Sequence, residues 1–312
     1  MSLNGTRGLN SYNIISYLFF KLTILLLSGA HLCHGCYPRM FIFGDSLTDT
    51  GNYLSIFGDA PMLPYGQTFF HKATGRWSDG RVFPDFIAKE LGMSLPLAYL
   101  NGKTAEDFLY GANFAVGGAT AMNHSFFQEK GITAADPRMG FLALQVQWFK
   151  QLLTLLCPQS DCRNILESSL FLVGEIGVND YHIPTSLVPF DEIRTFVPHV
   201  IQAIGAGIKE LIELGAKTLV VPGIIPFGCT PLYLTMYRTK NNEDYDEETG
   251  CMKWLNEFSD HHEKLLKEEL NNLQRLYPDA TIIHADYNGA SLDIFKSAER
   301  YGKFSEFYCN CL

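Results

Sequence analysis

Ser46 is the residue of this 312-residue chain whose surroundings best suit a nucleophile. The apolar residues 40–43 lead into Gly44, Asp45 and Ser46, a pattern that predicts a buried strand followed by a turn. A serine hydroxyl on such a turn can attack a carbonyl carbon, and its own N–H at the start of a helix can help to hold the oxyanion. The same residues could instead simply cap a helix. Other segments of the sequence are needed to choose between a nucleophile and a helix cap.

Two later segments also join an apolar run to residues suited to chemistry. Residues 113–120 read NFAVGGAT, and residues 174–181 read GEIGVNDY. A backbone without a Cβ, as in the Gly-Gly pair, can approach a substrate closely. The GxSxG pattern of the α/β-hydrolase elbow is absent from the sequence, which disfavours that route to a serine nucleophile.

Taken in order, these segments resemble the sequence blocks of the plant GDSL esterase/lipase family, within the SGNH hydrolases. Further matches are LPYGQTFF at 63–70, GRWSDGR at 75–81 and VPG through PFGC at 221–229, so the resemblance covers nearly the whole chain after residue 35. It is strongest to a plant subgroup that includes esterases of acetylated alkaloids, of the acetylajmalan type, and of sinapine-type choline esters.

The resemblance implies a carboxylic ester hydrolase that needs no cofactor and acts on small-molecule acyl, phenolic or alkaloid esters. Ser46 would be the nucleophile. The N–H of Gly118, with Gly117 as the alternative, and the side chain of Asn179 would form the oxyanion hole. Val178 stands where the family usually has glycine.

One block of the family is not found. An Asp-x-x-His motif supplies the orienting carboxylate and the base in the family, and no such motif occurs in these 312 residues. We therefore identify no catalytic base or orienting carboxylate, and expect a C-terminally incomplete form with impaired turnover. The alternatives are a non-catalytic ester-binding pseudoenzyme and an unstable truncated splice product. His182 is the nearest substitute base, followed by His71, whereas His284 is interpreted as structural.

The apolar patterns predict a doubly wound α/β fold. Strands are expected at 40–43, 114–116, 170–173, 218–221 and 281–285, and helices at 83–91, 142–156, 197–214 and 254–277. This alternation is typical of a three-layer αβα sandwich with a mainly parallel sheet, and the resemblance implies the SGNH, flavodoxin-like variant. Residues 36–312 are expected to form a single domain. Reactive residues should then gather at the carboxyl ends of the strands.

Composition limits the partners. A formal net charge of −9 and a pI near 5.5 provide no broad basic field, so no nucleic-acid partner is expected. The acidic run 243–248 lacks the spacing of a calcium loop, and the cysteines lack the paired spacing of a zinc site, so no metal is expected either. We expect a monomer.

Residues 1–35 are interpreted as a secretory signal peptide. The apolar stretch from Ile14 to Ala30 is interrupted by Lys21, and its uninterrupted core is too short for a stable membrane span. Cleavage is placed between Ala30 and Cys36. A secreted, extracellular protein would also suit the glycosylation sequon at Asn123.

Eight cysteines occur in the chain, and Cys33 would leave with the signal peptide. Cys157 and Cys162 lie close together in one loop, and Cys229 and Cys251 flank a longer one, so each couple is a plausible disulfide in an oxidising compartment. Both couples also resemble family cysteine positions. The partners of Cys36, Cys309 and Cys311 stay open.

Overall fold

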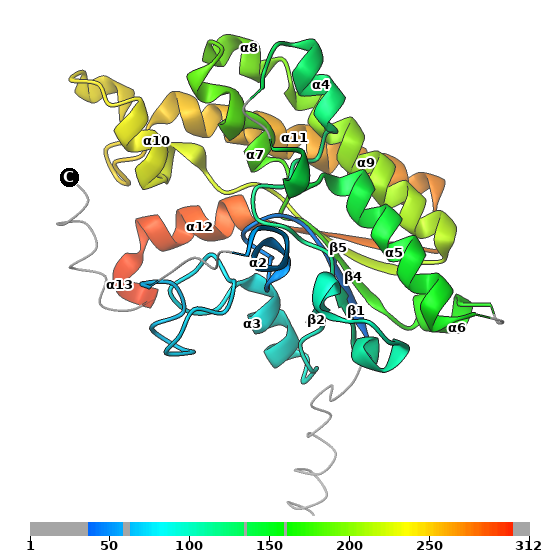
Figure 1. The fold of residues 1–312 in the computed structure, drawn as a ribbon. Helices are drawn as coiled ribbons and strands as arrows, with labels where there is room; N and C mark the ends of the chain where they lie inside the picture. Colours follow the sequence, from blue (N-terminus) through cyan, green and yellow to red (C-terminus); the bar gives the residue numbers. More distant parts are fainter. Residues whose placement is uncertain (1–36, 59–62, 134–135, 159–160, 302–312) are drawn as a thin grey trace, which may run out of the picture.

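A computed structural model describes residues 37–58, 63–133, 136–158 and 161–301. Its centre is a six-stranded sheet in the order β2-β3-β1-β4-β5-β6 (Figure 1). Every neighbouring pair of strands runs parallel, which confirms the expected α/β class. The strands are β1 (Met40–Phe43), β2 (Leu97–Ala98), β3 (Gly111–Asn113), β4 (Leu170–Val173), β5 (Thr218–Pro222) and β6 (Thr281–Ala285).

The helices connect the strands and cover the sheet. The α-helices are α2 (Asn52–Phe57), α3 (Phe83–Glu90), α4 (His124–Glu129), α5 (Leu142–Leu156), α6 (Arg163–Glu167), α7 (Val178–His182), α8 (Phe190–Arg194), α9 (Val197–Leu214), α10 (Pro231–Met236), α11 (Lys253–Leu276), α12 (Tyr287–Lys296) and α13 (Ala298–Tyr301). Short 3₁₀ helices are η1 (Tyr99–Asn101), η2 (Ala105–Phe108), η3 (Pro137–Met139), η4 (Ile183–Ser186), η5 (Phe227–Cys229) and η6 (Asn242–Asp244).

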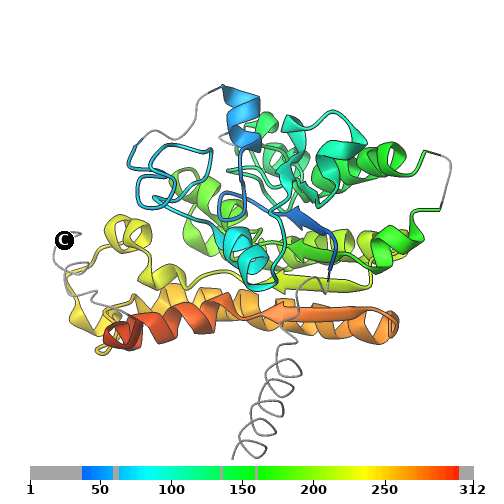
Figure 2. The ribbon, with the colours of Figure 1, turned by 90° about the horizontal axis from the view of Figure 1, so that it is seen from below.

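Successive residues of the central strand β1 serve two different cores. Phe41 and Phe43 belong to the larger cluster, which includes side chains of α5, α9 and α11, whereas Met40 and Ile42 belong to a smaller one with α3. Side chains alternate between the faces of a strand, so a strand buried on both faces has a continuous apolar sequence. In Figures 1 and 2, α3 lies on the face away from α5, α9 and α11, and α12 continues from β6.

The face that carries α3 is only partly covered. An apolar hollow of about 540 Å³ lies between α3 and the sheet, and Ile283 of β6 borders it with 45% of its surface exposed. Its other lining residues include Phe83, Phe86, Leu172, Val220 and Tyr287. The two faces of the sheet therefore contribute unequally to the buried core.

The expected strand at 114–116 is wrong by three residues. The ladder with β1 spans residues 111–113, and residues 114–116 form the buried segment that leaves the sheet. The short strand β2 was not expected. Helices α5 and α9 have the predicted bounds.

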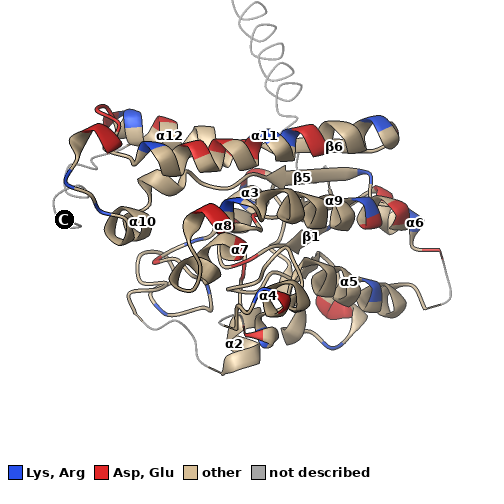
Figure 3. Ribbon diagram, turned by 90° about the horizontal axis from the view of Figure 1, so that it is seen from above, with Lys and Arg blue, Asp and Glu red and all other residues tan. Residues whose placement is uncertain are grey.

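Many of the charged residues lie on the outer helices. In Figure 3 acidic and basic residues are interspersed along α11, as expected of a solvated face. In the described part of the chain, no helix is both long and apolar enough to cross a membrane. The interpreted signal peptide lies outside the described residues.

Candidate active site

The turn that carries Ser46 is held by the backbone of Gly44. The buried side chain of Gln145 on α5 accepts the Gly44 N–H at 2.9 Å and donates to the Gly44 carbonyl at 2.8 Å. Gly44 has a φ of 153° and an added Cβ would lie 2.8 Å from the Glu175 carbonyl oxygen, so this position requires glycine. Ser46 is partly exposed at the turn, as a nucleophile must be.

Asp49 links this turn to the Gly-Gly segment. Its buried carboxylate accepts four backbone N–H groups at 2.7 to 3.0 Å, those of Gly51, Asn52, Tyr53 and Gly117. The Gly117 N–H is therefore engaged. The Gly118 N–H, by contrast, has no acceptor among the described residues, and Gly118 is partly exposed. Of the two glycines that the sequence left open, Gly118 is the one with an available donor.

Two buried asparagines fix the same segments to each other. Asn113 donates to the Thr48 carbonyl at 2.7 Å, and Asn52 donates to the carbonyls of Asn113 and Ala115 at 2.8 Å. Buried amides of this kind remain in place because their loss would leave backbone groups without partners. The sequence analysis did not identify either asparagine as part of the site.

Asn179 bridges the Ser46 turn and the Gly118 turn. It lies on α7, and its Nδ2 donates to Asp45 Oδ2 and to the Ala119 carbonyl, both at 2.9 Å. Both partners are acceptors, which fixes the orientation of the amide. The segments that carry the three predicted site residues therefore meet at the carboxyl edge of the sheet.

Val178 does not displace the loop. The left-handed φ of 126° occurs at the preceding residue, Gly177, while Val178 begins α7 in ordinary helical geometry. A glycine at 178 is therefore unnecessary for the position of Asn179.

Besides Asp49, three further carboxyl groups near these turns are fully buried, and none of the three was predicted from the sequence as a buried acid. Burial raises the pKa of Asp45 to about 7 and the pKa of Asp180 to about 7. Burial, with the charge of Asp45, raises the pKa of Glu175 well above its usual range. Asp180 accepts the N–H groups of Ala121 and Met122 at 2.7 and 2.9 Å. The only feature of the sequence that could have indicated buried acids is that Asp45 and Glu175 follow closely after apolar strands.

No histidine in the described ranges hydrogen-bonds Ser46. His182 ends α7, and its buried Nδ1 has no partner among these residues, while burial lowers its pKa. His71 is exposed and contacts the Gln67 carbonyl at 3.0 Å. His284 pairs with Glu263 at 3.0 Å, which agrees with a structural role.

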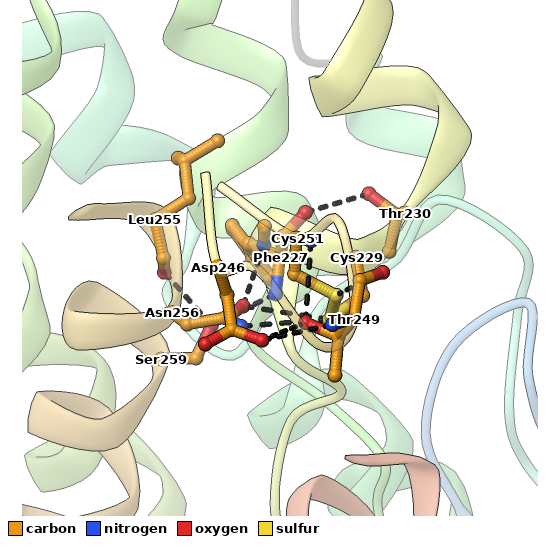
Figure 4. Close-up of a disulfide and its surroundings, with 10 residues drawn as sticks. Phe227, Cys229, Thr230, Asp246, Thr249, Cys251, Leu255, Asn256 and Ser259 are labelled. Atoms are coloured by element: carbon orange, nitrogen blue, oxygen red, sulfur yellow. Dashed lines mark hydrogen bonds between the residues drawn. A yellow bond between two sulfur atoms is a disulfide. The ribbon is translucent and has the colours of Figure 1, made fainter. Parts of the chain in front are cut away.

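Both expected disulfides are formed. Cys157 joins Cys162, and Cys229 joins Cys251. Around the second bridge, Asn256 of α11 accepts the Gly228 N–H at 2.9 Å, so the loop is fastened to the helix (Figure 4). Cys36, Cys309 and Cys311 lie outside the described residues.

Asn123 is exposed at the start of α4. Its Oδ1 accepts the Phe126 N–H at 3.2 Å and the Ser125 hydroxyl at 2.8 Å. These contacts use the oxygen, so the nitrogen that a glycan would modify is not part of the helix cap. Within the same described residues, no group of three or more His, Cys, Asp or Glu could hold a metal ion.

A mainly parallel six-stranded sheet with helices is consistent with an α/β fold of the SGNH type. Comparison with known sequences gives the family. The profile of the GDSL-like Lipase/Acylhydrolase family matches residues 40–308, and the chain belongs to this family.

Several plant proteins are similar to the chain over most of its length. GDSL esterase/lipase At1g31550 of Arabidopsis thaliana is 44% identical over 303 residues, 95% of this chain and 76% of the relative. GDSL esterase/lipase At1g28570 of the same plant is 45% identical over 88% of this chain and 71% of the relative. Sinapine esterase of Brassica napus is 43% identical over 91% of this chain and 75% of the relative.

Proposed function

We propose that the protein is a carboxylic ester hydrolase whose nucleophile is Ser46. The observation that carries this proposal is the junction made by Asn179. Its side chain joins the turn that carries Ser46 to the turn that carries Gly118. The backbone N–H groups of Ser46 and Gly118 have no acceptor among the described residues. Donors held in this way, before any substrate binds, are what stabilises a tetrahedral oxyanion.

The proposed reaction begins with attack of the Ser46 hydroxyl on the ester carbonyl carbon. The carbonyl oxygen becomes an oxyanion that accepts hydrogen bonds from the N–H groups of Ser46 and Gly118. Asn179 completes the hole by turning one N–H from the neutral Ala119 carbonyl toward the oxyanion, because a charged acceptor forms the stronger hydrogen bond. The ester C–O bond then breaks and the alcohol leaves with the proton lost by Ser46, after which water adds its OH to the acyl carbon and returns a proton to Ser46.

The step that lacks a partner is removal of the Ser46 proton. No histidine of the described residues contacts this serine, and the 312 residues contain no Asp-x-x-His motif. A protein with this sequence is therefore proposed to turn over slowly. Binding of esters without efficient hydrolysis is the second candidate function, and the same observation favours it.

The proposed substrates are small-molecule esters with an aromatic part. Trp77 packs directly against Gly117, where an added Cβ would lie 2.3 Å from the indole nitrogen. Tyr53 and Tyr65 make edge contacts with Trp77 at 4.9 and 5.7 Å. Aromatic surface therefore lies one residue from the proposed Gly118 donor, and a phenolic or alkaloid ester suits such surroundings.

We further propose that residues 1–35 are a signal peptide, that residues 36–312 form one domain, and that the protein is a secreted monomer with a glycan on Asn123. The two disulfides support this location, since such bonds persist in oxidising compartments.

Replacement of the nucleophile tests the proposed activity. Ser46→Ala should abolish hydrolysis of p-nitrophenyl acetate by the purified protein, while Ser94→Ala, at an exposed position, should leave the rate unchanged. Equal rates for Ser46→Ala and the unmodified protein would remove Ser46 from the mechanism.

A further inference from the structure

Asp45 and Glu175 form a buried pair directly beneath the Ser46 turn. They follow the adjacent strands β1 and β4, and the Asp45 N–H donates to the Glu175 carbonyl at 3.1 Å. Their side-chain carboxyl groups also lie within hydrogen-bonding reach of each other. Neither side chain reaches solvent, since Asp45 is 1% exposed and Glu175 is 0% exposed.

The hydrogen bonds around the pair leave one of its four carboxyl oxygens without a donor. Asp45 accepts from the Leu47 N–H at 3.0 Å and from Asn179 at 2.9 Å. Glu175 Oε1 accepts from the Val178 N–H at 3.4 Å. Glu175 Oε2 is buried and receives no donor from any described residue. Two carboxylates only accept hydrogen bonds, so a bond between them forms when one carries a proton.

The surroundings favour retention of that proton. Asp49 faces Asp45, and Asp180 faces both members of the pair. The tyrosines near Glu175 are Tyr181, Tyr233 and Tyr287, and burial raises the pKa of each above its usual range. None of these carboxyl groups forms an ion pair with a cation of the described residues. Like charges at such distances disfavour a second ionisation.

We propose that Glu175 holds this proton and donates it to Asp45, and that the singly protonated pair positions the Asn179 amide and the Ser46 turn for catalysis. This inference rests on the proposed function of Ser46 and Asn179. Glu175 is a positioning residue, because it acts through Asp45 and has no described contact with the nucleophile.

Loss of the proton would separate the two turns. A doubly ionised pair places two like charges side by side in the interior, where burial of each is unfavourable. The carboxylates would then move apart, and Asp45 also holds Asn179. We therefore expect the reactivity of Ser46 to fall on the alkaline side as the pair loses its proton.

Two substitutions of Glu175 separate positioning from mere packing. Glu175→Leu removes the donor and should slow the reaction of Ser46 with an organophosphonate by about 10- to 100-fold, the range expected when a reacting group is misplaced. Glu175→Gln keeps an N–H donor that cannot ionise, so it should recover most of that loss and also abolish the alkaline decline. Glu167→Gln, on the exposed end of α6, is the matched control and should behave as the unmodified protein.

Infrared spectroscopy measures the proton without reference to activity. The unmodified protein at neutral pH should show the C=O band of a protonated buried carboxyl that Glu175→Gln lacks and Glu167→Gln retains. Absence of this band in the unmodified protein would overturn the proposal, as would unchanged pH profiles in both Glu175 variants. If the band is present but the organophosphonate never labels Ser46, the protonated pair is confirmed and the proposed role of Ser46 as nucleophile is wrong.

Discussion

Asp49 joins the two turns that carry Ser46 and Gly118, because its carboxylate accepts N–H groups from both. Asp45 works on the opposite side of Ser46, where it orients Asn179. The donors of the proposed oxyanion hole are thus held by acids rather than by the packing of apolar side chains. A side chain that satisfies several buried N–H groups is costly to remove, since each unpartnered group costs about 1–3 kcal/mol.

The buried acids predict how stability depends on pH. The pKa of Asp45 and the pKa of Asp180 are both raised to about 7 from an ordinary 3.8, so the folded state binds these protons more tightly than the unfolded state. Their contribution is present below pH 3.8 and is lost as pH rises to about 7. Each titrating group lowers the free energy of unfolding by up to about 1.4 kcal/mol per pH unit.

Urea denaturation between pH 4 and 7 measures this slope. Asp180→Asn should flatten it by removing one titrating group, while Asp191→Asn, at a fully exposed side chain, should not. A slope that is unchanged by Asp180→Asn would contradict the assignment.

The resemblance to the GDSL esterase/lipase family was needed to predict Ser46, Gly118 and Asn179 as candidates, because residue types and positions alone are equally typical of helix caps and turns. Gly118 was already preferred to Gly117 from the sequence, and the structure adds that the Gly117 N–H is engaged by Asp49. Glu175 could not be predicted as a buried acid, since its burial depends on segments more than a hundred residues away.

Among the secondary-structure elements, strands with a continuous apolar sequence were predicted, and strands without one were missed. β3 consists of Gly111, Ala112 and Asn113, residue types with low strand propensity. The strand was therefore predicted at the apolar residues that follow, 114–116. β2 has only two residues and is too short for any pattern. α9 ends as predicted because Gly215 terminates it with a φ of 122°.

Because one face of the sheet is only partly covered, we expect apolar substitutions there to destabilise the protein to different extents. Leu172 is 1% exposed, whereas Ile283 is 45% exposed at the border of the hollow beside α3. Leu172→Ala should lower the free energy of unfolding by about 2–5 kcal/mol, because it leaves a cavity in the core. Ile283→Ala should lower it by about 1 kcal/mol or less. Thermal or urea unfolding measures both, and equal losses would contradict the described cover of this face.

At the scale of the whole molecule, the two disulfides and the apolar N-terminal segment lead to one expectation. Expression in a secreting plant cell should yield exported protein whose first residue lies between His31 and Cys36. N-terminal sequencing identifies this residue, and mass spectrometry finds any glycan on Asn123. Recovery of the chain from the cytosol with Met1 intact would contradict export.

We expect a large gain in ester turnover from a chimera, because no Asp-x-x-His motif occurs in these 312 residues. Fusion of these 312 residues to an Asp-x-x-His segment from a family member should raise ester turnover by at least about 10³-fold, since removal of the base from a serine triad costs on the order of 10⁶. Hydrolysis of p-nitrophenyl acetate by the two proteins gives the ratio. If the rates are equal, a histidine already present must act as the base, and His182→Ala should then abolish activity.

The most direct test of the central claim is a map of the covalent adduct. The purified protein is incubated with a serine-directed organophosphonate, digested and analysed by tandem mass spectrometry. We expect a single adduct on Ser46, formed faster in the chimera and absent from Ser46→Ala. An adduct on another serine, or equal labelling of the Ser46→Ala variant, would contradict it.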